Sequence, residues 1–157
     1  MEIKYINPFI DAVGRVFKDF FKITPDVLKP YIVKKDEEHN WDISGIIGIA
    51  GEAKGVVVIS FSKNIALKFV SILVDKDITD INEDVTDAIG EVVNIIAGNA
   101  KKGLEEYRLM ISLPSIISGP EHKIIWPGKN IPIVGIPFST SYGDFNLSIG
   151  LENIISI

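Results

Sequence analysis

The strongest constraint on the fold is one long amphipathic helix, predicted for residues 82–104. Asn82 is a favourable N-cap, and Gly103 is expected to end the helix in the left-handed conformation. Acidic residues follow the N-cap and lysines precede the glycine, which suits the helix dipole. Apolar side chains recur along one face, so the helix must pack against another layer of the protein. These apolar positions are Val85, Ala88, Ile89, Val92, Val93, Ile96, Ala97 and Ala100.

The opposite face of this helix holds the candidate functional residues. Glu91 and Asn94 are three positions apart, which makes them neighbours on a helix surface. Gly90 and Gly98 flank them, and each glycine costs about 1 kcal/mol of helix stability relative to alanine. Such costs suggest that another molecule comes close. The alternative is a solvated polar face with tolerated glycines, and the helix alone favours that alternative. The face comprises Asp87, Glu91, Asn94, Gly98 and Lys101.

The composition indicates a globular protein and excludes several classes of function. The chain has 157 residues, of which 46% are hydrophobic, so we expect residues 1–157 to form a single domain. A net charge of −5 without a basic stripe argues against nucleic acid and anionic membranes as partners. The absence of cysteine excludes disulfides, thiol nucleophiles and zinc sites built on thiolates.

No segment of the sequence indicates a membrane location. The first residues, MEIKYINPFI, lack the basic and apolar regions of a signal peptide. No apolar run approaches the roughly 18 residues that a membrane-spanning helix requires. We therefore expect a cytoplasmic protein.

The remaining pattern predicts an α+β fold, with long helices packed on one face of a mostly antiparallel β-sheet. Asn7 and Pro8 are expected to open a first helix, and Ser62 or Asn64 to cap a second. Two hairpin-rich segments each lie near a helix, which suggests an internal duplication, although no residue-level repeat is evident. The predicted strands are residues 31–33, a hairpin over 41–61, and residues 110–117, 123–126, 131–139 and 145–151.

Other candidate sites have simpler explanations, and no metal site is expected. His39 and His122 lie in polar segments without a second ligand at metal spacing, so we interpret both as surface histidines. The acidic residues in 75–87 lack the spacing of a calcium loop and suit the start of a helix. The glycines in 45–55 match no phosphate-binding pattern and are interpreted as turn and packing residues.

Three sequence blocks and one signature indicate a family relationship. The signature is an acidic residue, then glutamate and asparagine spaced E-x-x-N on a long helix, then small residues. Asp87, Glu91, Asn94 and Gly98 match it in place. In these features nearly the whole chain resembles the CheC/CheX/FliY chemotaxis phosphatases, and the CheX branch in particular. The blocks are YINPFI at 5–10, DISGIIGIAGEAKGVVVISF at 42–61 and INEDVTDAIGEVVNIIAGNAKKGL at 81–104.

The resemblance implies a CheC/CheX-like fold and hydrolysis of the aspartyl phosphate on a CheY-type response regulator. It implies that Asn94 positions the attacking water and that Glu91 pairs with a lysine of the regulator. No cofactor is expected on this chain, because Mg²⁺ is expected on the regulator. The residues expected at the partner surface are Asp87, Gly90, Gly98 and Lys101.

The resemblance also sets expectations for the number of sites and for assembly. CheC relatives carry a second motif on the first helix. Here Asp11 is followed three residues later by Gly14, so one site per chain is expected. CheX relatives are homodimers joined through sheet edges, which predicts a homodimer here. Two alternatives stay open: a non-catalytic module that docks on a phosphorylated regulator or a flagellar switch complex, and an unrelated soluble domain. Only the enzyme requires the Asn94 amide.

Overall fold

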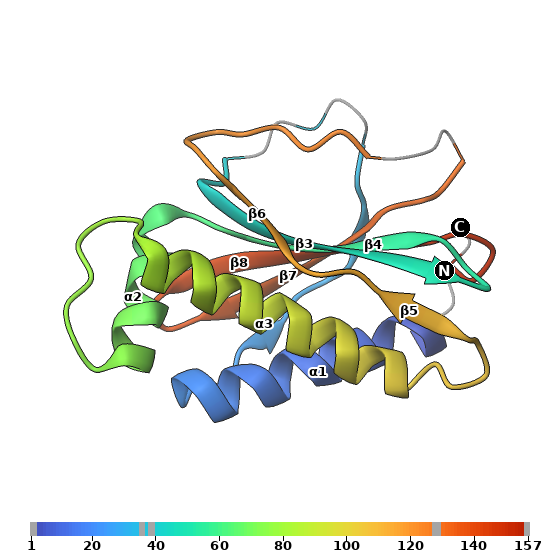
Figure 1. Cartoon of the computed structure of the whole chain (residues 1–157), viewed down its shortest axis with the longest axis horizontal. Helices are drawn as coiled ribbons and strands as arrows, with labels where there is room; N and C mark the ends of the chain where they lie inside the picture. Colours follow the sequence, from blue (N-terminus) through green and yellow to red (C-terminus); the bar gives the residue numbers. More distant parts are fainter. Residues whose placement is uncertain (1–2, 35–36, 38–39, 127–129, 156–157) are drawn as a thin grey trace.

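A computed structural model describes residues 3–34, 37, 40–126 and 130–155 of the protein. In these residues, three helices lie on one face of an eight-stranded antiparallel sheet (Figure 1). The predicted α+β class is confirmed. No helix in the described ranges combines the length and apolarity needed to cross a membrane. The helices are α1 (Ile3–Phe21), α2 (Lys63–Val74) and α3 (Glu83–Lys102); the strands are β1 (Asp26–Val27), β2 (Tyr31–Ile32), β3 (Ile43–Gly51), β4 (Gly55–Phe61), β5 (Leu109–Ile111), β6 (Ser115–Ser118), β7 (Val134–Thr140) and β8 (Gly143–Leu151).

Two similar halves of the chain build the sheet. Each half runs through a helix, two short strands and a long hairpin, and α2 lies between the halves. β4 pairs with β8, so the hairpins meet at the centre in the order β7, β8, β4, β3. The short strands are exchanged, since β1 and β2 pair with β7 while β5 and β6 pair with β3. The duplication suggested by the sequence is present in this arrangement.

Alternation along the strands separates a helix-covered face of the sheet from an opposite face. In β4, Val57 belongs to the core beneath the helices, whereas Val56 belongs to a smaller cluster on the opposite face. All eight apolar positions predicted for α3 are buried in the helix-side core. In the same core Phe17 of α1 stacks on Phe145 of β8, with ring centroids 4.4 Å apart. These contacts hold α1 and α3 against the sheet.

Two helix ends differ from the prediction. α1 begins at Ile3 and contains Pro8, instead of beginning at the proline. The added turn buries Ile6, which offsets the backbone hydrogen bond lost at Pro8. Gly103 follows α3 with a φ of −76°, so the predicted left-handed cap is wrong. A Cβ on Gly103 would lie 2.7 Å from Cβ of Pro8, so glycine is needed there for close packing.

Three further details correct the predicted elements. The Ser62 side chain forms no cap on α2; instead the N–H of Lys63 donates to Oδ2 of Asp42 at 2.6 Å. The strand predicted over 110–117 is two strands, β5 and β6, because residues 112–114 leave the ladder. Residues 123–126 form no strand, although Ile124 and Trp126 pack against the opposite face of the sheet.

Candidate functional site

The exposed face of α3 brings Glu91 and Asn94 together, and we call these two residues the candidate pair. Glu91 is exposed and Asn94 is half-buried, one turn apart in the middle of the helix. The buried stripe of α3 packs on the sheet and on α1, which fixes the backbone beneath both side chains. A carboxylate and a carboxamide are therefore presented from a rigid element, as a positioning site requires.

Neither group of the candidate pair is used inside the protein. In the described ranges no side chain or backbone group bonds to the Glu91 carboxylate or to the Asn94 carboxamide. Polar residues nearer the start of the helix are engaged: Asn82 accepts from the N–H of Val85 at 3.1 Å, and Asp84 pairs with Lys76 at 3.2 Å. The candidate pair is therefore free to meet another molecule.

The charges around the candidate pair favour a cationic partner. Asp87 lies one turn before Glu91, so two carboxylates are neighbours on the helix surface. No cation of the described chain forms an ion pair with either one. Like charges at this spacing destabilise a helix by about 0.2–0.5 kcal/mol, which a cation of a partner would relieve. Lys101 is exposed near the C-terminal end of the helix.

The two glycines of this region have different surroundings. Gly98 is half-buried, and a Cβ there would meet only Cδ1 of Ile111, at 3.9 Å. Gly90 is buried, and a Cβ there would lie 3.6 Å from Pro114 and 3.7 Å from Ile116. Gly90 thus packs beneath residues of this same chain, and its role at the partner surface stays a prediction. Gly98 leaves open space beside the candidate pair.

His122 is not the surface histidine that the sequence suggested. Its Nε2 lies 2.7 Å from Oγ of Ser44, which in turn lies 2.7 Å from Oγ of Ser60. Nδ1 of the same ring lies 3.0 Å from the carbonyl oxygen of Gly119. This network attaches residues 119–122 to the opposite face of the sheet. Its sequence signal is a pair of serines at hairpin positions that face away from the helices. The other predicted surface histidine, His39, lies outside the described residues.

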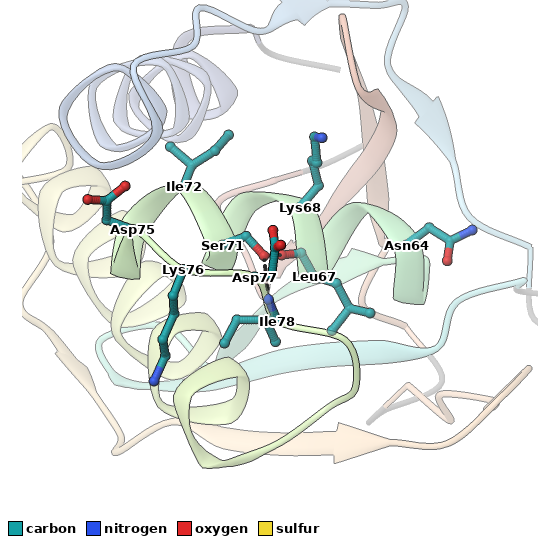
Figure 2. Close-up of a pocket in the computed structure, with 9 residues that line it drawn as sticks. All are labelled: Asn64, Leu67, Lys68, Ser71, Ile72, Asp75, Lys76, Asp77 and Ile78. Carbon is teal, nitrogen blue, oxygen red and sulfur yellow. Dashed lines mark hydrogen bonds between the residues drawn. The ribbon is translucent and has the colours of Figure 1, made fainter.

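An open hollow of about 670 Å³ beside α2 is a second candidate site (Figure 2). At its centre, Oγ of Ser71 donates to the Leu67 carbonyl at 2.7 Å and accepts from the N–H of Ile78 at 3.0 Å, which fixes the chain after α2. Close by, a hydrogen bond from Lys63 lowers the pKa of Asp80. No group of metal-binding side chains gathers here or elsewhere in the described ranges. The hollow carries mixed charges without a catalytic arrangement; its charged lining residues are Lys68, Asp75, Lys76 and Asp77.

Comparisons with known proteins agree on one family. The family model described as chemotaxis phosphatase CheX matches residues 43–139. A CheY-P phosphatase CheX from Thermotoga maritima is 31% identical over 157 residues, covering 98% of this chain and 99% of that protein. A crystal structure of chemotaxis protein CheX from Desulfovibrio desulfuricans is 35% identical with a TM-score of 0.86, covering 94% of this chain and 99% of that one. In the crystal structure of the CheX–CheY–BeF3–Mg²⁺ complex from Borrelia burgdorferi, the matching chain is 28% identical with a TM-score of 0.80. The match covers 94% of this chain and 97% of that one.

Proposed function

This chain belongs to the CheX family of chemotaxis phosphatases, and we propose that Asn94 and Glu91 form its active site. The reaction is hydrolysis of the aspartyl phosphate on a CheY-type response regulator. The observation that carries the assignment of residues is the free candidate pair: a carboxamide and a carboxylate, one turn apart on a rigid helix, with no partner among the described residues.

In this proposal Asn94 acts by positioning water. Water attacks phosphorus and the bond between phosphorus and the regulator's aspartate breaks. Inorganic phosphate is released, and the aspartate of the regulator is left as a free carboxylate. The regulator holds the Mg²⁺ and a lysine that balance the charge of the phosphoryl oxygens, so an aligned water is what this chain has to supply. A carboxamide presents an acceptor oxygen and donor hydrogens, which lets Asn94 hold one water in a fixed orientation. An amide is no base at neutral pH, so the rate gain comes from geometry.

Glu91 orients the regulator in the same proposal. Its carboxylate pairs with the regulator's lysine, and a charge-assisted hydrogen bond of this kind sets a docking angle. Asp87 adds a second negative charge one turn earlier, and Gly98 leaves room for the partner to approach. Lys101 completes the set of expected contacts on this face.

The wider setting of the enzyme is also a proposal. Residues 1–157 act as one phosphatase domain in the cytoplasm, where a CheY-type regulator is found. This chain binds no cofactor of its own, and the Mg²⁺ belongs to the regulator. Two copies join through sheet edges, which in the described chain are formed by β1 and β2 on one side and by β5 and β6 on the other.

A phosphate-release assay separates the enzyme from a docking module. The loss of phosphate from an aspartate-phosphorylated regulator is measured with wild type, Asn94→Ala and Asn99→Ala. We expect Asn94→Ala to lower kcat by about 100-fold or more with little change in KM. Asn99 is the matched control, because it lies on the same helix but lines the cleft between α3 and α1. Phosphorylation-dependent binding without acceleration by wild type would favour the docking module.

A further inference from the structure

The ladder along β3 is interrupted between β5 and β6 by a hydrogen-bonded bulge. Ser112 uses both backbone groups of Gly48: its N–H donates to the Gly48 carbonyl at 2.9 Å, and its Oγ accepts from the Gly48 N–H at 2.9 Å. The same hydroxyl donates to the carbonyl of Leu113 at 2.8 Å. The interruption is thus held by specific bonds, and bulges of this kind often redirect a side chain beside a functional site.

This bulge lies alongside the candidate pair. Ile111, just before it, is the neighbour of Gly98, and Pro114, just after it, is the neighbour of Gly90. The segment therefore runs antiparallel to α3, along the side on which its two glycines lie (Figure 1). The two glycines are eight residues apart, about 12 Å along a helix, so Leu113 lies at the level of the candidate pair.

Leu113 has no packing role that would explain an apolar residue at this position. Its side chain is 88% exposed, whereas Ile111 packs against the helix-side core and Pro114 lies against α3. Single exposed leucines are common and need no explanation by themselves. This one is different because a hydrogen-bonded bulge holds it at the level of the two free polar groups of the candidate pair.

We propose that Leu113 is a docking contact for the CheY-type regulator, which places an apolar part of its surface, next to the phosphorylated aspartate, on this leucine. The proposal rests on the proposed function and deepens it. The polar candidate pair then sets the docking geometry and carries out the chemistry. The adjacent leucine contributes affinity because its apolar side chain is removed from water when the complex forms. An apolar contact of this type, central in an interface and bordered by polar groups, is where binding energy concentrates.

The test separates docking from catalysis. Leu113→Ala and Leu113→Asp are compared with wild type in phosphate release and in binding to a regulator loaded with beryllofluoride and Mg²⁺. We expect Leu113→Ala to raise KM and Kd about tenfold and Leu113→Asp to raise them further, with kcat at saturating regulator within about twofold of wild type. Ile125→Asp is the matched control: Ile125 is 87% exposed, but its neighbours cover the opposite face of the sheet.

The outcomes also separate this proposal from the proposed function. Unchanged KM and Kd in Leu113→Asp would overturn the docking role, even if Asn94→Ala abolished turnover as expected. An equal rise in Ile125→Asp would also overturn it, since it would reveal a general effect of charge. A wild type that binds without hydrolysis would reject the proposed function, and a higher Kd for Leu113→Asp would then still support docking at this leucine.

Discussion

The two halves of the molecule have the same arrangement but carry different surfaces. α1 and α3 lie side by side on one face of the sheet, each at the start of its half (Figure 1). α3 has Glu91 and Asn94 spaced three apart, whereas α1 has Asp11 and Gly14 at the same spacing. A Cβ on Gly14 would meet nothing within 4 Å, so the amide is missing from α1 although space for it exists.

The short strands of the two halves also share one arrangement but carry different exposed residues. The segment between β1 and β2 leaves the sheet as the segment between β5 and β6 does, and each ends in a proline. The N–H of Leu28 donates to the carbonyl of Pro137 at 2.8 Å, as that of Ser112 donates to Gly48. The residue before the proline is an exposed lysine, Lys29, in the first half and Leu113 in the second.

Separate residues determine the scaffold and the site. The buried residues of both halves maintain the same order of helix, short strands and hairpin. A few exposed positions then decide which helix offers a carboxylate with an amide. Function therefore depends on those exposed positions and not on the shared arrangement.

Building a glutamate and an asparagine on α1, in a variant that lacks Asn94, tests whether α1 can act as a second site. The variant combines Asn94→Ala with Asp11→Glu and Gly14→Asn. We expect the loss in phosphate release of about 100-fold to persist, because Lys29 stands where α3 has an apolar neighbour and would repel the regulator's lysine. Thermal unfolding checks that the variant is folded. Recovery of more than a tenth of wild-type activity would show that α1 is a competent second site.

Removing one carboxylate from each helix tests which helix contacts the regulator. We expect Glu91→Ala to raise KM for the phosphorylated regulator about tenfold, because a charge-assisted contact is lost, and Asp11→Ala to leave KM unchanged. The effect of Glu91→Ala should shrink at high ionic strength, since exposed charges are screened. Titrations with the phosphorylated regulator at low and high salt measure KM for both variants. Similar losses in the two variants would mean that the regulator contacts both helices.

The same substitution at two glycines should have opposite effects on stability. Gly103→Ala is expected to lower the free energy of unfolding by about 1 kcal/mol or more, because the new methyl group overlaps Pro8. Gly14→Ala is expected to raise it by about 0.5–1 kcal/mol, because α1 gains a better helix former in open space. Urea denaturation of both variants gives the two values. A gain in Gly103→Ala would contradict the close packing of α1 on the end of α3.

Features that depend on nearby residues were predictable from the sequence. The stripe of α3 and its Asn82 cap follow from periodicity and local chemistry, and runs of β-branched residues revealed the hairpins. The candidate pair was identified by its spacing within a family signature. The start of α1 was missed because it depends on the burial of Ile6 in a core built from distant segments. The bonds of His122 to Ser44 and of Ser112 to Gly48 join distant segments in the same way, and no local pattern reports them.

The exchange of short strands between the halves has a consequence for biosynthesis. β1 and β2 can pair only after β7 has been translated, and the edge of β4 stays open until β8 follows. Phe17, translated early, stacks on Phe61 of β4, but its closer stacking partner, Phe145, lies in β8. A nascent chain that ends before residue 143 therefore carries unpaired strands and an exposed aromatic helix face, which are features that promote aggregation. The first half therefore keeps these surfaces exposed until the second half has been translated, and the complete sheet forms only then.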